Sequence, residues 1–178
     1  EVISEKLQLT FGGYLDSQKI NYMVSSDINK EQGIISKINK KTLGFSLSAR
    51  WLFKKKLIEK FQKRFVNVHG SNLPKNRGGG GYSWRIMNND LAGEVCIHFV
   101  ETGIDTGDIL LRSRFDFNSK CKIPLDFYNQ ADKKMEELIK SFFIKINNKE
   151  NFKLTTQDEN ISTYWPRLST KINAFIDW

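Results

Sequence analysis

Short apolar stretches and segments with helical spacing alternate along the first half of the chain. "KINYMVSS", at 19–26, alternates apolar and polar positions and predicts a strand. "KEQGIISKINKK", at 30–41, predicts a helix. "TLGFSLSA", at 42–49, predicts a second strand that is buried on both faces. A strand, a helix and a strand in this order indicate a parallel pair with a crossover helix.

The same alternation continues after residue 50. "RWLFKKKLIEKFQKR", at 50–64, predicts a helix with a basic outer face, because Leu57, Ile58 and Phe61 recur at helical spacing. The later expected elements are a strand in "RFVNVHG" (64–70), a short helix in "YSWRIMNND" (82–90), strands in "GEVCIHFVE" (93–101) and "ILLRSRFDF" (109–117), and a long amphipathic helix at 123–148. These elements predict one α/β domain over 1–178, with a mostly parallel sheet, helices on both faces and a mixed or antiparallel portion.

The two ends of the chain fit this pattern less well. The opening "EVISEKLQLTFGGYL" contains no clear first βα unit, so we expect the N-terminal part of the domain to be missing. Residues 150–178 predict an aromatic, irregular C-terminal tail of the same domain.

Composition limits the class of protein. The 178 residues suffice for a sizeable core, and 39% hydrophobic with 27% charged residues indicates a soluble, globular chain. We expect it in the cytoplasm, because it shows neither a secretory signal nor an apolar run that could span a membrane. Cys96 and Cys121 are expected to be reduced thiols. The net charge of +8 fits an anionic partner, or merely Lys-rich surface composition.

Candidate chemistry begins at the end of the strand "RFVNVHG". Asn67 and His69 are two residues apart, so their side chains share one face, while Val66 and Val68 point into the core. An Asn amide can donate to a developing oxyanion, and a His can accept a proton from an attacking amine. The pair therefore fits acyl transfer, although such a pair at a strand end is more often structural.

The second element is the turn "GIDTGDIL", at 103–110. Asp105 either bonds its own backbone, as is common before Gly, or orients a histidine and raises its pKa. His98, within "CIHFV", has no partner signature, and we expect it to be structural.

Together, "NVHGSNLPKNRG" at 67–78 and "GIDTGDIL" closely resemble the N10-formyltetrahydrofolate-dependent formyltransferases. The 36 residues from His69 to Asp105 resemble the family spacing, and the likeness runs from about Ile20 to Trp178. The resemblance implies a Rossmann-like core, without a clear first βα unit, and catalytic roles for Asn67, His69 and Asp105. It implies N10-formyltetrahydrofolate as co-substrate, with no metal. The implied folate-binding residues are Arg50, Trp51, Leu52, Gly103, Ile104 and Asp105.

The resemblance is greatest to sugar N-formyltransferases that act on nucleotide-linked 4-amino-4,6-dideoxy sugars, such as dTDP-4-amino-4,6-dideoxyglucose, for surface polysaccharide. The loop "GGGGYSW" and the tail "STYWPRLSTKINAFIDW" carry this likeness. The implied acceptor-binding residues are Ser71, Arg77, Gly78, Tyr164, Trp165 and Arg167. A homodimer is possible, and we expect neither nucleic acid nor a membrane as partner. The alternatives are a methionyl-tRNA formyltransferase core, favoured by the +8 charge, a formyl-folate hydrolase, and a truncated non-catalytic homologue.

Overall fold

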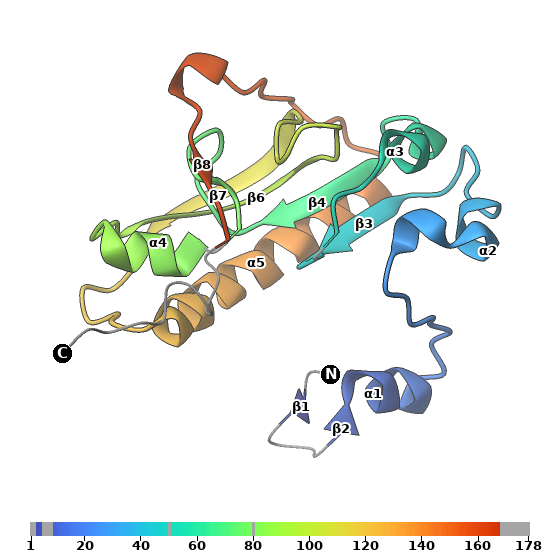
Figure 1. Cartoon of the computed structure of the whole chain (residues 1–178), viewed down its shortest axis with the longest axis horizontal. Helices are drawn as coiled ribbons and strands as arrows, with labels where there is room; N and C mark the ends of the chain where they lie inside the picture. Colours follow the sequence, from blue (N-terminus) through green and yellow to red (C-terminus); the bar gives the residue numbers. More distant parts are fainter. Residues whose placement is uncertain (1–2, 5–8, 50, 80, 168–178) are drawn as a thin grey trace.

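The centre of the fold is a four-stranded sheet in the order β3–β4–β6–β7 (Figure 1). The computed structural model describes residues 3–4, 9–49, 51–79 and 81–167. The strands of this sheet are β3 (Gly44–Leu47), β4 (Phe65–His69), β6 (Ala92–Phe99) and β7 (Ile109–Asp116). β3 and β4 run parallel, as predicted, and β4, β6 and β7 pair antiparallel. The sheet is therefore mixed, and its antiparallel portion is larger than the sequence suggested.

Helices cover both faces of the sheet, as predicted. The 24-residue helix α5 (Pro124–Asn147) crosses one face, where Leu138 and Phe142 join Val66 and Val68 in the main core. Figure 1 shows α5 running behind the strands. On the other face, Phe65 packs against Leu57 and Phe61 of α3 (Lys55–Phe61) and against Ile35 of α2 (Gln32–Ile35).

The alternation of side chains along β4 decides which face carries the candidate chemistry. Val66 and Val68 are buried toward α5. Asn67 and His69 therefore share the opposite face with Phe65. Since α3 covers only the Phe65 end of that face, the carboxyl end of β4 is left for a site.

The first predicted strand, at 19–26, is not formed. No strand is described between Gln18 and Leu43, and Tyr22, Met23 and Val24 are exposed because no neighbouring strand covers them. The predicted helix at 30–41 is reduced to a 3₁₀ turn, Ile28–Lys30, and the four-residue α2. Its second half gives way to a turn, in which the Asn39 side chain accepts from the Lys41 amide. Asn favours such local bonds over helix.

The basic helix is also shorter than expected. α3 ends at Phe61 because Gln62 and Lys63 take left-handed backbone angles, with φ of 47° and 63°. Before it, β1 (Ile3–Ser4), β2 (Leu9–Thr10) and α1 (Phe11–Ser17) form a small unit that Figure 1 shows set apart from the sheet. Among the described residues, β3 pairs only with β4, so its outer edge has no partner strand.

The loop after β4 is tied to the chain's tail. β5 (Arg77–Gly78) pairs in parallel with β8 (Tyr164–Trp165), which follows the 3₁₀ turn Glu159–Ile161. The predicted short helix is α4 (Gly81–Met87). Both cysteines are buried and free, as expected. None of the helices in the described part of the chain is long and apolar enough to cross a bilayer.

Candidate active site

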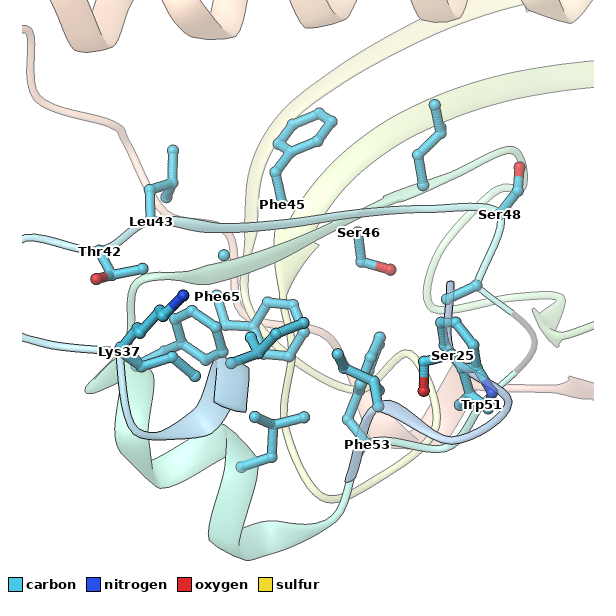
Figure 2. A pocket seen from close by; sticks show the side chains of 18 residues that line it. Ser25, Lys37, Thr42, Leu43, Phe45, Ser46, Ser48, Trp51, Phe53 and Phe65 are labelled. Atoms are coloured by element: carbon cyan, nitrogen blue, oxygen red, sulfur yellow. The ribbon is translucent and has the colours of Figure 1, made fainter. Parts of the chain in front are cut away.

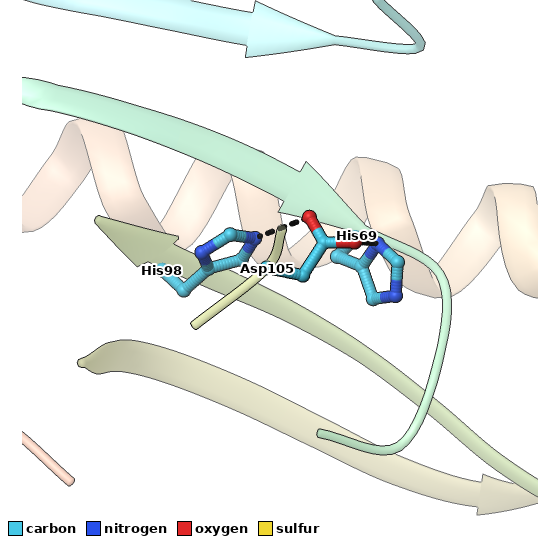
Figure 3. Close-up of side chains that lie close together, drawn as sticks. All are labelled: His69, His98 and Asp105. Carbon is cyan, nitrogen blue, oxygen red and sulfur yellow. Dashed lines mark ion pairs between the residues drawn. The ribbon is translucent and has the colours of Figure 1, made fainter. Parts of the chain in front are cut away.

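The fold brings Asn67, His69 and Asp105 together, although Asp105 is 36 residues away from His69 in sequence. Asn67 and His69 come from the end of β4, and Asp105 comes from the turn between β6 and β7. Figure 3 shows His69 and Asp105 side by side. The Asp105 carboxylate oxygen Oδ2 lies 3.6 Å from His69 Nδ1, and it accepts the Gly78 amide N–H at 2.9 Å. The sequence motifs therefore meet in one place, as the resemblance implied.

The turn that carries Asp105 is held in an uncommon conformation. Asp105 itself has a φ of 52°, in the left-handed region, which is costly for a residue with a side chain. The Gln157 side-chain amide donates to the carbonyl oxygens of Asp105, at 2.8 Å, and of Gly107, at 2.7 Å. A Cβ on Gly107 would collide with the carbonyl oxygen of Phe99. Only glycine lets the turn approach the end of β6 this closely.

Opposing effects set the charge of Asp105. Burial alone would raise the pKa of its carboxyl. The hydrogen bond with His98 and the charge of His69 outweigh burial, and the Gly78 amide adds to them, so the pKa falls to about 2. The carboxylate is therefore ionised at neutral pH.

Burial has the opposite consequence for the neighbouring imidazole. It lowers the pKa of His69 from 6.5 by more than the Asp105 carboxylate raises it, and His98 lowers it further. His69 is therefore neutral at pH 7 and able to accept a proton. The protonated ring of His69 has an acceptor beside each of its nitrogens. Asp105 Oδ2 faces Nδ1, and the Asn76 carbonyl oxygen lies 3.3 Å from Nε2.

His98 also belongs to this group of side chains, whereas the sequence showed no partner for it. Its Nε2 lies 3.4 Å from Asp105 Oδ1 and 3.3 Å from Asn67 Nδ2. Figure 3 shows the His98 and His69 rings on either side of the Asp105 carboxylate. His98 and Asn67 face each other on the neighbouring strands β6 and β4, a pairing across 31 residues of sequence that neither segment reveals alone.

His69, His98 and Asp105 are also the donor set that a metal ion could use, since their donor atoms lie within 4.8 Å of one another. The outer nitrogens are already engaged, with Nε2 of His69 at the Asn76 carbonyl and Nδ1 of His98 at the Phe99 carbonyl. The hydrogen-bond partners thus explain the arrangement without an ion.

A cavity of about 600 Å³ opens beside these residues. Five residues expected at the folate are on its walls: Trp51 and Leu52 from the loop after β3, and Gly103, Ile104 and Asp105 from the turn between β6 and β7. Trp51 also donates its indole N–H to the Ser26 carbonyl oxygen at 2.6 Å, which anchors the loop. Arg50, also expected there, lies outside the described residues.

A second, larger cavity of about 850 Å³ lies next to β3 and reaches toward α3 (Figure 2). It is lined mainly by apolar side chains, and Figure 2 shows Phe53, Phe65 and Ser46 on the opposite side of β3 from Phe45. Both cavities share the segment Leu47–Ala49 with Trp51 and Phe53, so they meet at the loop after β3. The triad lines only the smaller one.

The residues expected at the acceptor divide into two groups. Ser71, Gly78, Tyr164 and Arg167 line the cavity of the triad. The Ser71 hydroxyl donates to the Asn76 carbonyl oxygen at 2.9 Å and so stabilises the loop after β4. Tyr164 is about half exposed and is available to a ligand.

Arg77 and Trp165 are not among the described residues that line this cavity. Arg77 is buried and clamps the tail, donating to Gln157 Oε1 at 3.0 and 3.2 Å and to both carboxylate oxygens of Glu159 at 2.7 and 2.8 Å. Trp165 stacks on Trp84, with ring centroids 6.4 Å apart. We therefore assign both side chains to packing of the tail rather than to the acceptor.

The sequence profile described as "Formyl transferase" matches residues 21–134, which contain all three triad residues. The chain belongs to the formyl transferase family. It spans about half the length of the curated relatives it matches. The methionyl-tRNA formyltransferase of Rickettsia rickettsii (strain Iowa) is 30% identical over 146 residues, which cover 82% of this chain and 46% of the relative.

Solved structures of family members share the fold. WlaRD, a sugar 3N-formyl transferase solved in the presence of dTDP and 5-N-formyl-THF, matches with a TM-score of 0.73 and 27% identity over 90% of this chain and 54% of that one. A 4-N formyltransferase from Francisella tularensis matches with a TM-score of 0.69 and 27% identity, over 92% and 63% of the two chains. The N-formyltransferase from Helicobacter canadensis, in complex with folinic acid and dTDP-3-aminofucose, matches with a TM-score of 0.75 and 25% identity, over 93% and 56%. The chain thus has the α/β fold of its family.

Proposed function

We propose that the chain transfers a formyl group from N10-formyltetrahydrofolate to the amino group of a nucleotide-linked amino sugar. The observation that carries the proposal is the meeting of Asn67, neutral His69 and ionised Asp105 in one cavity of a formyltransferase fold. A folate and a dTDP ligand occur together in two relatives of known structure that resemble this chain. The expected use of the product is surface polysaccharide synthesis.

The three side chains divide the reaction between them. As the acceptor amine attacks the formyl carbon, the formyl oxygen gains negative charge, and the Asn67 amide donates a hydrogen bond to it. A new C–N bond forms to the amine, and the C–N bond to N10 of the folate breaks. The proton leaves the amine for His69 and passes on to N10. Asp105, ionised throughout, stabilises the imidazolium that His69 becomes for part of the cycle.

The residues that line the cavity offer contacts to both substrates. Trp51, Leu52 and the 103–104 turn offer aromatic and apolar surface to the pterin, with the formyl group directed at the triad. At the same cavity, exposed Tyr164 can stack on a nucleotide base, and Arg167 supplies a positive charge for the pyrophosphate.

A second candidate acceptor is initiator methionyl-tRNA. The identity to the rickettsial methionyl-tRNA formyltransferase and the net charge of +8 favour it. The sugar is preferred because Tyr164 and Arg167 stand at the triad cavity, which suits a small nucleotide ligand.

Mass spectrometry of the reaction products tests the proposal. The purified chain is incubated with N10-formyltetrahydrofolate and a panel of 3-amino and 4-amino dideoxy sugars linked to dTDP or UDP, with initiator methionyl-tRNA in a parallel reaction. We expect one sugar to gain a single formyl group. Formylation of the tRNA alone would assign the second candidate, and release of formate without transfer would indicate a hydrolase.

Variants separate catalysis from folding. His69→Ala and Asp105→Ala should abolish formyl transfer while circular dichroism stays that of the wild type. Asp116→Asn, an exposed carboxylate at the end of β7, is the matched control and should keep full activity. Full activity in either triad variant would refute the proposed roles of His69 and Asp105.

A further inference from the structure

Tyr82, in the first turn of α4, lines the cavity of the triad without belonging to the triad. Its ring stacks on Phe127 of α5, with ring centroids 6.2 Å apart, and meets Phe117 edge-on at 6.3 Å. These contacts join the Tyr82 ring to the main core. The ring is therefore fixed in position, and its hydroxyl group is held at a defined point of the cavity wall.

The Tyr82 hydroxyl lies beside the segment that leaves the catalytic strand. Gly70 directly follows His69, and a Cβ on Gly70 would be 3.4 Å from Tyr82 Oη and 3.8 Å from the terminal methyl group of Met135. His69, Gly70, Tyr82 and Met135 all line the same cavity. A ligand that binds beside Gly70 is therefore within reach of both the Tyr82 hydroxyl and the triad.

The hydroxyl is available to such a ligand. None of the described residues hydrogen-bonds it, and the oxygen is not enclosed, since the enclosed side-chain atoms without a partner belong to Ser46, Arg85 and Glu94. Burial raises the pKa of Tyr82 to about 12, so the group stays protonated and able to donate at neutral pH. By contrast, Tyr128 lines the same cavity but is half exposed, so its hydroxyl is held less firmly.

We propose that Tyr82 is a specificity-determining residue whose hydroxyl donates a hydrogen bond to the ring hydroxyl next to the reacting amine of the acceptor sugar. The proposal rests on the proposed formyl transfer to such a sugar. Both dTDP-4-amino-4,6-dideoxyglucose and dTDP-3-aminofucose carry a hydroxyl on a carbon adjacent to the one that bears the amine. The amine must reach His69, and its neighbouring hydroxyl then lies beside Gly70, at Tyr82 Oη. A site that pairs with a ligand hydroxyl rejects a ligand without it, because the group of the site is left unpaired.

Equilibrium binding tests the contact without turnover. Isothermal titration calorimetry of the whole chain, with tetrahydrofolate present, compares these two sugar nucleotides with dTDP alone. Tyr82→Phe removes only the hydroxyl. We expect it to raise the Kd of the tighter-bound sugar nucleotide about tenfold and that of dTDP less than about twofold. Tyr14→Phe, in α1 and outside the cavity, is the matched control and should bind as the wild type does.

Deoxy analogues of the tighter-bound sugar nucleotide, each lacking one hydroxyl next to the amine, identify the sugar atom. For one analogue, the wild type should lose about tenfold in affinity, whereas Tyr82→Phe should bind that analogue and the parent within about twofold of each other. The urea midpoint of Tyr82→Phe should equal that of the wild type, because its hydroxyl loses no partner among the described residues. In turnover, kcat/KM for the acceptor should fall about tenfold, with KM for the folate unchanged.

The outcomes separate this contact from the proposed function. Equal Kd values for Tyr82→Phe and the wild type, or a loss that extends equally to dTDP, would overturn the sugar contact and leave formyl transfer intact. Additive losses from the variant and every analogue, with a lower urea midpoint, would show that Tyr82 is merely structural. If the wild type binds neither sugar nucleotide, the sugar acceptor of the proposed function is wrong, and the Tyr82 contact with it.

Discussion

Substitution of Arg77 distinguishes a role in packing of the tail from a role in substrate binding. Arg77→Met removes four hydrogen bonds, two to Gln157 and two to Glu159. Glu159 is 67% exposed, so water replaces its lost partner at little cost. Gln157 is only 7% exposed, and its unpaired Oε1 costs about 1–3 kcal/mol. We therefore expect the free energy of unfolding to fall by about 2 kcal/mol.

Urea unfolding followed by tryptophan fluorescence measures this change, since Trp84 and Trp165 stack beside the clamp. A loss of about 2 kcal/mol corresponds to a decrease of about 4–8 °C in Tm for a chain of this size. Glu159→Gln is the matched control and should cost less than about 1 kcal/mol. If Arg77→Met leaves stability unchanged and only weakens acceptor binding, Arg77 contacts the substrate and the packing role is wrong.

Three further changes test the site and the core. Because burial lowers the pKa of His69, the unfolded chain binds a proton near pH 6.5 that the folded chain does not. The free energy of unfolding in urea should therefore fall as pH decreases through 6.5, and His69→Gln should remove that slope. In a pH–rate profile, kcat/KM follows the lowered pKa of folded His69, so its decrease should begin only below pH 6.5. Gly107→Ala forces a Cβ against the Phe99 carbonyl and should lower Tm markedly, whereas Gly81→Ala meets nothing within 4 Å and should not; equal melting curves would contradict the close contact. Phe142→Ala empties the core under the sheet and should cost about 3–5 kcal/mol in urea unfolding, and a cost below about 1 kcal/mol would refute its burial there.

The sequence predicts the half of the fold in which local pattern and tertiary environment agree. The strand ending in Asn67 and His69 and the helix from Pro124 are predicted correctly, because both bury one strongly apolar face. The segment 19–26 has an equally good strand pattern, yet it has no neighbouring strand to pair with, so its pattern is not realised. Hydrogen-bond partners across a sheet cannot be read from one segment alone.

For the site, the sequence identifies the residues of the motif but not their supports. Gln157 stands 52 residues after Asp105 and looks like any polar tail residue, yet it holds the Asp105 turn. The family resemblance implies that Arg77 contacts the acceptor, but its hydrogen-bond partners lie 80 and 82 residues further on. His98 looks like a core residue in the sequence for the same reason: its partners come from neighbouring elements.

The pairing of β5 with β8 has a consequence for the order of events during synthesis. The catalytic side chains are all made by the time residue 105 leaves the ribosome, but the strand that secures Gly78 beside Asp105 comes only at 164–165. Gln157 and Glu159, which hold Arg77, also come late. A nascent chain therefore carries the triad for about 60 residues before the loop beside it closes, so a chain from which only residues up to 156 have emerged should fold its central sheet without a competent site.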